Sequence, residues 1–432
     1  MAEFQITPMT RPLRGTIHVP ADKSISHRAA ILGALADGET RVKNFLPSAT
    51  TRATLNCLRA LGVGIEPVDA TTLVVHGRGL HSLRESSDVL FCAGSGTTMR
   101  LLAGVCAGQD FLSILDGTPA LKRRPMARVA EPLRAMGARV LARAGGLPPL
   151  ALRGGSLHGI DYTLPVASAQ VKSAILLAGL FADSTTTVRE PSPSRDHTER
   201  MLKACGVELK IRNSKFEIAT SPVTEFRIPN SEFRIPNDFS SAAFFIVAAL
   251  LVPQSEICIE GVGINPTRTG LLDALHRMGA RVEIENVREE SGEPVADLVV
   301  GAGELQSTTV SGEQVPRMID EFTIFAMAAT QARGETIVRD AQELRVKESD
   351  RLATLAQELR KMGAQIEERA DGFVIAGPTP LRGARVDAHN DHRLAMSLAV
   401  AGLVARGETR IDGWECVADS FPNFGATLEQ IR

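Results

Sequence analysis

The sequence predicts an α/β fold built from six repeated units, grouped as two lobes of three. Its 432 residues exceed what one hydrophobic core usually organises, and 44% of them are hydrophobic, enough for two cores. A pattern of apolar helix, short polar break and β-rich segment recurs along the chain. A second pattern, an amphipathic helix that ends in glycine and is followed by a strand, alternates with it.

The apolar segments are the clearest repeats, and SAQVKSAILLAGLFADSTTTVRE is a typical copy. The six copies begin at Ser26, Gly96, Ser168, Ser240, Ile319 and Asp391. The glycines that end the alternating amphipathic helices suit a left-handed C-terminal cap, and they are Gly62, Gly137, Gly206, Gly279 and Gly363. Their spacing of about 70 to 80 residues is too long for a solenoid and is typical of a βαβαβ-type unit.

Two segments with a shared pattern predict where the chain crosses between lobes. Residues 18–24 (HVPADKS) and 234–240 (RIPNDFS) both contain Pro-x-Asp-x-Ser. We therefore assign residues 1–21 and 238–432 to one lobe and 22–237 to the other, with the active site in the cleft between them. Two ordinary strand-to-helix turns are the alternative. Before the second crossing, EFRIPNS is followed by a near copy, which predicts a longer extended linker.

Composition excludes several classes of function. With 48 basic and 50 acidic residues the net charge is -2, so no overall field attracts nucleic acid or an anionic membrane. Aromatic residues make up 4%, which leaves few platforms for stacking bases. The longest apolar stretch, residues 242–253, is too short for a bilayer span. We expect a cytoplasmic protein with six reduced cysteines, because no secretory signal or metal-like spacing is present.

Polar residues and cations gather where the apolar helices begin. A helix N-terminus offers unpaired N–H groups to anions, and eight cations lie at repeat boundaries: Lys23, Arg28, Arg100, Arg124, Arg195, Lys347, Arg351 and Arg393. Each motif taken alone also has a purely structural explanation, as a capped turn or a solvated face. Together they predict a site for substrates with several phosphates and carboxylates, because buried anions need paired charges.

Acidic residues accompany the cations in the C-terminal half. Asp320 lies at the start of an apolar helix, where a carboxylate is a candidate general base, and a helix N-cap is the alternative. In ELRVKESDR, Lys347 and Arg351 are four residues apart, which places them on one face of a predicted helix. Ion pairing within that helix is the alternative there.

Seven motifs in order carry a family resemblance: DKSISHRA, GSGTTMRLLAG, RRPMARV, SAQVKSA, SRDHTERM, ELRVKESDRL and NDHRLAM. From about Thr7 to Leu428 the chain resembles the 5-enolpyruvylshikimate-3-phosphate synthase family. The resemblance implies two inside-out α/β lobes that close on phosphoenolpyruvate and shikimate 3-phosphate. It also implies a monomer and an addition–elimination reaction that requires no metal or organic cofactor.

The resemblance further implies a role for particular residues. Shikimate 3-phosphate would be held by Lys23, Ser24, Arg28, Ser168, Ala169, Gln170, Arg195, Asp320 and Lys347. Phosphoenolpyruvate would contact Lys23, Gly96, Arg124, Gln170, Arg351 and Arg393. Asp320 would take the proton of the substrate 5-hydroxyl, and Glu348, alongside Lys23, would move the methyl proton.

Four departures from the family pattern bear on rate and affinity. Ala21 stands where glycine is usual, Ala93-Gly94 replaces a common Gly-Asn, Thr50 replaces an acidic residue, and Asp419 stands where some relatives have lysine.

Two other functions stay open at this point. The sister enolpyruvyl transferase for UDP-N-acetylglucosamine carries a reactive cysteine in a loop that here, at residues 117–124, has none. A non-catalytic phosphosugar-binding protein would need the cations but no carboxylate base, and Lys23, Asp320 and Glu348 favour the enzyme.

Overall fold

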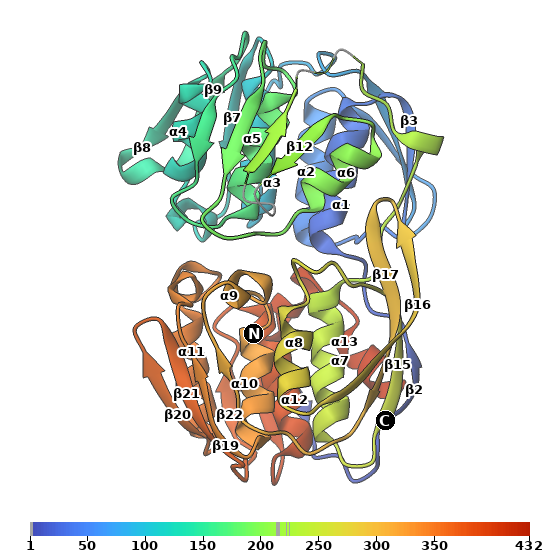
Figure 1. The fold of residues 1–432 in the computed structure, drawn as a ribbon, viewed down its shortest axis with the longest axis vertical. Helices are drawn as coiled ribbons and strands as arrows, with labels where there is room; N and C mark the ends of the chain where they lie inside the picture. Colours follow the sequence, from blue (N-terminus) through green and yellow to red (C-terminus); the bar gives the residue numbers. More distant parts are fainter. Residues whose placement is uncertain (1–2, 213–216, 222, 224) are drawn as a thin grey trace. The chain divides into compact units, whose positions relative to one another are not determined.

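The computed structural model describes residues 3–212, 217–221, 223 and 225–432. Contacts divide the chain into two compact units (Figure 1). Unit 1 comprises Met1–Pro20, Pro236–Arg288 and Pro294–Arg432, and unit 2 comprises Ala21–Ile235 and Glu289–Glu293. Glu289–Glu293, the turn of a β-hairpin, belongs to unit 2. No sequence pattern predicts this assignment.

Within the described residues, unit 2 contains three four-stranded sheets with one shared topology. Their strand orders are β14 (Glu232–Arg234), β3 (Asp37–Lys43), β5 (Leu73–Arg78), β4 (Gly64–Pro67); β6 (Leu90–Phe91), β7 (Leu112–Asp116), β9 (Leu147–Arg153), β8 (Arg139–Arg143); and β10 (Asp161–Thr163), β11 (Thr186–Arg189), β13 (Glu217–Thr220), β12 (Leu209–Arg212). In every sheet the first pair is parallel and the following pairs are antiparallel. This common order is the structural form of the sequence repeat.

Unit 1 repeats the arrangement in the part of the chain that is described. Its sheets are β18 (Thr309–Val310), β19 (Gly334–Val338), β21 (Gly372–Gly377), β20 (Gln365–Arg369); β2 (Arg14–Ile17), β15 (Glu256–Gly263), β17 (Glu293–Gly301), β16 (Arg281–Glu290); and the three-stranded β22 (Arg385–Asp387), β23 (Thr409–Asp412), β1 (Glu3–Ile6). Each again opens with a parallel pair.

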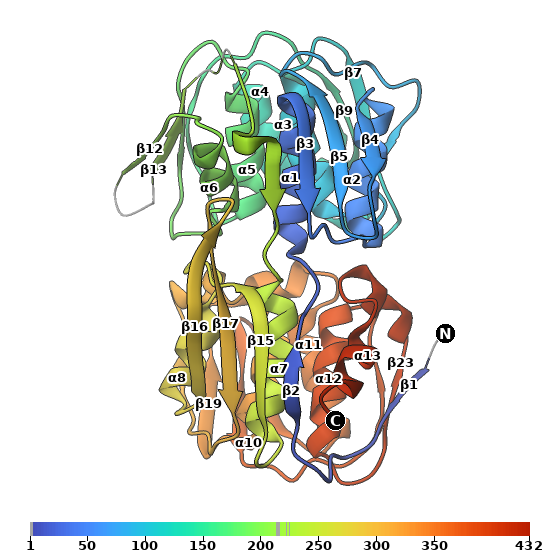
Figure 2. The same cartoon turned by 90° about the vertical axis from the view of Figure 1, so that its right-hand side faces the viewer.

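Strand pairing at the crossings differs from the rest of the repeats. Elsewhere an apolar helix joins two parallel neighbours, as α3 joins β6 to β7. At the crossings, β2 instead pairs with β15 inside unit 1 (Figure 2), and β14 pairs with β3 inside unit 2. The second copy of the duplicated segment therefore supplies strand β14 at Glu232–Arg234, whereas we expected a linker.

Six apolar helices form the interior of the two units. They are α1 (Lys23–Leu35), α3 (Gly96–Ala107) and α5 (Ala169–Gly179) in unit 2, and α7 (Phe239–Leu251), α10 (Phe322–Gln331) and α12 (His392–Val404) in unit 1. Nearly all their residues are buried. Alternation of Ala and Gly with larger residues lets the helices approach closely: a Cβ on Gly104 of α3 would lie 2.2 Å from the Ala174 carbonyl oxygen of α5.

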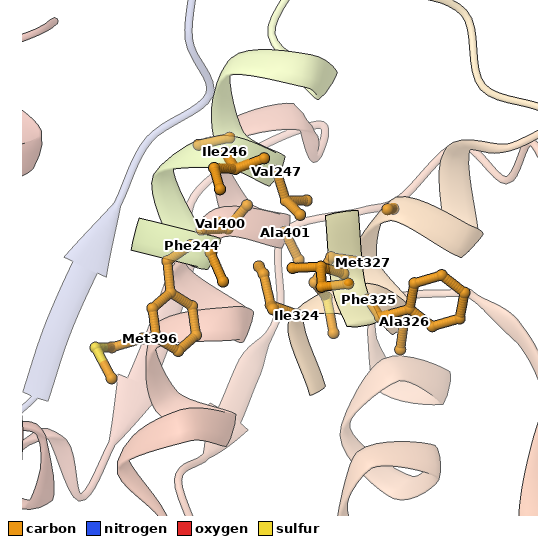
Figure 3. Close-up of a cluster of buried hydrophobic side chains, with 14 of the residues drawn as sticks. Phe244, Ile246, Val247, Ile324, Phe325, Ala326, Met327, Met396, Val400 and Ala401 are labelled. Atoms are coloured by element: carbon orange, nitrogen blue, oxygen red, sulfur yellow. The ribbon is translucent and has the colours of Figure 1, made fainter. Parts of the chain in front are cut away.

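In the core of unit 1, the three apolar helices pack against one another. Phe244 and Val247 of α7 pack beside Ile324 of α10 and Met396 and Val400 of α12 (Figure 3). Because these helices carry apolar side chains on every face, they are buried all round, and sheets and amphipathic helices cover them. Burial of this apolar surface is the main force that holds the unit together.

Amphipathic helices alternate with the apolar ones, as the glycine pattern predicts. They are α2 (Ala49–Ala60), α4 (Ala127–Ala135), α6 (His197–Ala204), α8 (Gly270–Arg277) and α11 (Arg351–Lys361), and the short helices α9 (Gln314–Arg317) and α13 (Phe424–Glu429) complete the set in the described chain. The five predicted cap glycines all have positive φ, between 80° and 107°. The prediction of glycine C-caps is confirmed.

The cysteines and helix lengths complete the description. All six cysteines are free thiols, and five of them are buried. Among the described residues, none of the helices combines the length and apolar character needed to cross a bilayer. The same residues contain no cluster of three or more His, Cys, Asp or Glu side chains arranged to hold a metal ion.

Candidate functional site

The predicted residues of unit 2 begin at the N-terminus of α1. Asp22 caps this helix, because its carboxylate accepts a hydrogen bond from the Ile25 amide at 2.8 Å. Lys23 and Ser24 follow and are half-buried, while the rest of the helix is buried. The cap therefore leaves an ammonium and a hydroxyl group at the positive end of a helix, an arrangement that suits an anion.

Arg28 lies one turn further along α1 and is almost fully buried. Its guanidinium donates to the hydroxyl of Thr198 at 2.7 Å, the hydroxyl of Ser173 at 2.8 Å and the carbonyl of Ser24 at 2.9 Å. Burial lowers the pKa of Arg28 to about 10, opposed by Glu199 and other carboxylates. Arg28 thus connects α1 to α5 and α6 and stays charged at neutral pH.

Gly96, Arg100, Arg124 and Gln170 come together at the start of α3. A Cβ on Gly96 would lie 2.8 Å from Arg100 Nη1 and 3.3 Å from Arg124 Nη1. The Gln170 side chain accepts from Arg100 and donates to Thr97 at 2.8 Å. Glycine at position 96 is therefore what lets two guanidinium groups lie against the N-terminus of a helix.

The remaining predicted residues of unit 2 lie at the start of α5 and just before α6. Ser168 and Ala169 are half-buried, and the Ser168 side chain makes no capping hydrogen bond to α5. Arg195 is half-buried and follows Ser194, which is buried. In the charge run 122–124, Lys122 pairs with Asp116 at 2.7 Å and Arg123 is exposed, so Arg124 alone lies beside Gly96.

In unit 1, Asp320 lies between two arginines. Its carboxylate is 3.4 Å from Arg351 Nη1 and 3.4 Å from Arg393 Nη2, and its backbone carbonyl accepts from Arg393 at 3.3 Å. Helix α10 begins at Phe322, so Asp320 precedes it and does not cap it. The N-cap alternative considered for Asp320 is therefore wrong.

Arg351 is buried and surrounded by carboxylates. It donates to Asp391 at 2.8 Å and to Glu348 at 2.7 Å, besides its contact with Asp320. Burial opposes its charge, but Asp391, Glu348 and Asp320 together raise the pKa of Arg351 above its usual range. The guanidinium is therefore a fixed cation.

Lys347 departs from the sequence prediction. Helix α11 begins at Arg351, and Lys347 lies in extended backbone after a short 3₁₀ turn at Gln342–Val346. The prediction that Lys347 and Arg351 share a helix face is wrong, because the Asp350 side chain caps α11 and so ends the turn before it. Burial lowers the pKa of Lys347, with Asp320 opposing the shift.

Comparison with known proteins decides the family. The model for EPSP synthase (3-phosphoshikimate 1-carboxyvinyltransferase) matches residues 8–428. The chain belongs to the EPSP synthase family. The predicted resemblance and the transferase class are confirmed.

Relatives in the EPSP synthase family match almost the whole chain. The 3-phosphoshikimate 1-carboxyvinyltransferase of Desulforudis audaxviator is 53% identical over 433 residues, and that of Gloeobacter violaceus is 53% identical over 434, each covering 99% of both chains. The EPSP synthase structure from Acinetobacter baumannii superimposes with a TM-score of 0.89 at 42% identity and covers 99% of this chain. This likeness confirms the predicted two-lobed α/β fold.

Sequence reasoning missed several residues that hold the candidate site residues in place. Thr198 and Ser173 accept from Arg28, and Asp391 holds Arg351. Ser173 lies inside an apolar run, where a hydroxyl needs a partner, and this was the available signal. In the sequence, Asp391 is recognisable only as the first residue of the sixth apolar repeat.

One hollow in unit 2 lies apart from these residues. It has a volume of about 440 Å³ and is lined by Pro229, Glu232, Arg234, Glu290 and neighbouring residues. It contains none of the predicted site residues, so it does not represent the site described above.

Proposed function

We propose that this chain transfers the enolpyruvyl group of phosphoenolpyruvate to the 5-hydroxyl of shikimate 3-phosphate and releases phosphate. The observation that carries the proposal is the position of Asp320 between Arg351 and Arg393, in a chain whose family match spans nearly its whole length. The carboxylate is a group that can accept a proton, and the two guanidinium groups beside it suit anionic substrates.

Shikimate 3-phosphate is assigned mainly to groups of unit 2. Lys23 and Ser24 at the start of α1 suit its phosphate, since helix N-termini and cations both favour phosphate groups. Arg28, Ser168, Ala169, Gln170 and Arg195 complete this set, and Asp320 and Lys347 are the contributions of unit 1. The sets in the two units serve one pair of substrates in this proposal.

Phosphoenolpyruvate is assigned to the arginine groups. Arg124 beside Gly96, together with Lys23 and Gln170, is the proposed contribution of unit 2, and Arg351 and Arg393 are that of unit 1. Guanidinium groups match the planar carboxylate and the phosphate, and they stabilise the charge of the tetrahedral adduct.

The proposed reaction has two stages. Asp320 takes the proton of the 5-hydroxyl, the oxygen bonds to C2 of phosphoenolpyruvate, and a proton from Lys23 or Glu348 adds to C3. In the second stage the bond from C2 to the phosphate oxygen breaks, phosphate leaves, and C3 returns a proton to the same group. One C–O bond forms at C2 and one breaks, and no electrons pass to or from a cofactor, so the chemistry calls for no redox cofactor.

The assembly and location of the protein are part of the proposal. We infer a cytoplasmic monomer that acts on small molecules, without nucleic acid or membrane partners. The balanced charge and the scarcity of aromatic residues support the absence of nucleic-acid and membrane partners, and the monomeric state is the one that the family resemblance implies. Neither UDP-N-acetylglucosamine transfer nor silent phosphosugar binding gains support from a specific feature of the site.

The role of Asp320 is tested by a matched pair of variants. Asp320→Ala should lower kcat at least about 100-fold, because a general base contributes about that much. Asp412 of strand β23 is the control. Its carboxylate pairs with Arg385 at 2.7 Å, and neither residue is among the predicted site residues. Asp412→Ala should keep kcat near the wild-type value, and an equal loss in both variants would contradict the assignment.

A further inference from the structure

Lys172 of α5 is a buried cation that the proposed mechanism does not use. Its side chain is 1% exposed, and its ammonium lies 2.6 Å from Glu190 Oε1, 2.7 Å from Glu199 Oε1 and 3.3 Å from the carbonyl of Ser194. A buried ammonium group is tolerated only when it is paired and hydrogen-bonded. Lys172 meets both conditions, because two carboxylates and a carbonyl surround it.

Glu190 extends this contact to the backbone that leads into Arg195. Its second oxygen accepts from the amide of Ser194 at 3.2 Å and from the hydroxyl of Ser194 at 2.5 Å. The amide, the hydroxyl and the carbonyl of Ser194 are therefore all held by Glu190 and Lys172. Arg195 is the next residue, so these contacts restrain the backbone at its N-terminal side.

Glu199 extends the same contact to α6. Its neighbour Thr198 accepts from Arg28, and Ser173, the neighbour of Lys172 on α5, contacts both Thr198 at 2.7 Å and Arg28 at 2.8 Å. Two consecutive residues of α5 thus help to position two cations of the proposed shikimate 3-phosphate site. Lys172 holds the segment before Arg195, and Ser173 holds Arg28.

We propose that Lys172 is a positioning residue for binding of the anionic substrate, acting through Glu190 and Ser194 on Arg195. This inference rests on the proposed function, which assigns Arg195 to shikimate 3-phosphate. Lys172 itself does not touch the substrate, because its ammonium is surrounded by protein groups. Its role is to keep Arg195 in the geometry that the phosphorylated ring requires.

The test is a double-mutant cycle on the full chain, with the Kd of shikimate 3-phosphate measured by calorimetry. Lys172→Met keeps an unbranched side chain one atom shorter and removes its charge, and it should weaken binding about tenfold. In an Arg195→Ala background the same change should weaken binding by less than about threefold, because its effect passes through Arg195. Equal fold-losses in both backgrounds would overturn the inference.

A milder variant covers the case in which Lys172→Met does not fold. Ser194→Ala removes one hydroxyl contact to Glu190 and should weaken binding about threefold while the KM of phosphoenolpyruvate stays within about twofold. Ser82→Ala is the matched control, since that hydroxyl also makes one hydrogen bond in unit 2, to the Gly79 carbonyl at 2.7 Å. Unchanged binding in Ser194→Ala would overturn the inference.

The wild-type protein separates this inference from the proposed function. If the wild-type protein binds shikimate 3-phosphate and turns it over, the proposed function is supported, whatever the variants do. If the variants then keep the wild-type Kd, only the proposed role of Lys172 is overturned. Wild type that neither binds nor reacts would overturn both.

Discussion

The guanidinium of Arg351 donates to both carboxylate oxygens of Asp391, at 2.8 and 3.3 Å, and both side chains are almost completely buried. Asp391 also caps α12 by accepting from the amide of Arg393 at 3.0 Å. One carboxylate therefore positions two arginines that we assign to phosphoenolpyruvate. Arg351 extends from α11 and Arg393 from α12, so the contact also joins two helices.

Asp391→Asn should weaken both the fold and the site. Removal of one partner of a buried ion pair destabilises a protein by about 3 kcal/mol. We expect up to that loss here, because Glu348 and Asp320 remain beside Arg351. We expect a lower urea midpoint and a KM for phosphoenolpyruvate that rises more than that for shikimate 3-phosphate. Asp412→Asn, which removes a charge from an exposed pair with Arg385, is the control and should leave the midpoint close to wild type. Equal midpoints for the two variants would contradict the prediction.

Gly96→Ala should act on phosphoenolpyruvate selectively. The added methyl group meets Arg100 Nη1 at 2.8 Å and Arg124 Nη1 at 3.3 Å, so it displaces the cations and leaves the helix intact. The KM of phosphoenolpyruvate should rise about tenfold, while that of shikimate 3-phosphate changes less than about threefold. Gly303→Ala, where a Cβ meets nothing within 4 Å, is the control. Unaltered steady-state kinetics in Gly96→Ala would refute this reading of the site.

His27 predicts a specific dependence of stability on pH. Burial, together with the charges of Lys23 and Arg28, lowers the pKa of His27 from 6.5 to about 3 in the folded protein. Below pH 6.5 the unfolded chain therefore binds more protons, and the free energy of unfolding falls as the pH falls toward 3. This group alone should remove about 2 kcal/mol between pH 7 and pH 5.

His27→Gln should flatten that slope. The variant keeps a polar group opposite Thr54, whose hydroxyl lies 2.6 Å from His27 Nδ1, and it removes the titration. Urea unfolding at pH 7 and pH 5 gives the two free energies for each protein. Parallel slopes in wild type and variant would show that His27 does not govern this range.

Ala93 is a departure from the family pattern with a measurable consequence. Its φ of 49° lies in the left-handed region, where an L side chain is strained by about 1 to 2 kcal/mol. Its carbonyl accepts from Thr118 at 2.9 Å, which holds the turn in this conformation. Ala93→Gly should therefore raise the free energy of unfolding by about 0.5 to 1 kcal/mol, after the entropy of the added glycine is deducted.

A second glycine substitution checks the sign of that effect. Ala60 lies in the last turn of α2 with an exposed side chain, so Ala60→Gly should destabilise by about 0.5 to 1 kcal/mol. Chemical denaturation of both variants measures the difference directly. A loss of stability in both would mean that the turn at Ala93 carries no strain.

The apolar helices and their caps were predictable because each is a local pattern. Continuous runs such as SAILLAG have no polar face, so they have to be buried, and glycine after an amphipathic helix marks its end. Strand pairing was not predictable at the crossings. The pairs β2–β15 and β14–β3 join segments far apart in sequence, and no local pattern specifies such a partner.

Sequence motifs predict the candidate site residues, but they do not predict how the side chains are arranged. The spacing of Lys347 and Arg351 predicts a shared helix, but Asp350 caps α11 just before Arg351. The contact of Arg28 with Thr198 spans 170 residues, so only the folded chain reveals it. Ion pairs between repeats depend on side-chain placement, which sequence spacing does not encode.

Phosphate release from phosphoenolpyruvate, measured with the wild-type chain, is the most direct test of the proposed enolpyruvyl transfer. The assay is run with shikimate 3-phosphate, with UDP-N-acetylglucosamine in its place, and with neither. The proposed function predicts phosphate release only in the reaction that contains shikimate 3-phosphate. Release only with UDP-N-acetylglucosamine, or no release in any of the three reactions, would contradict it.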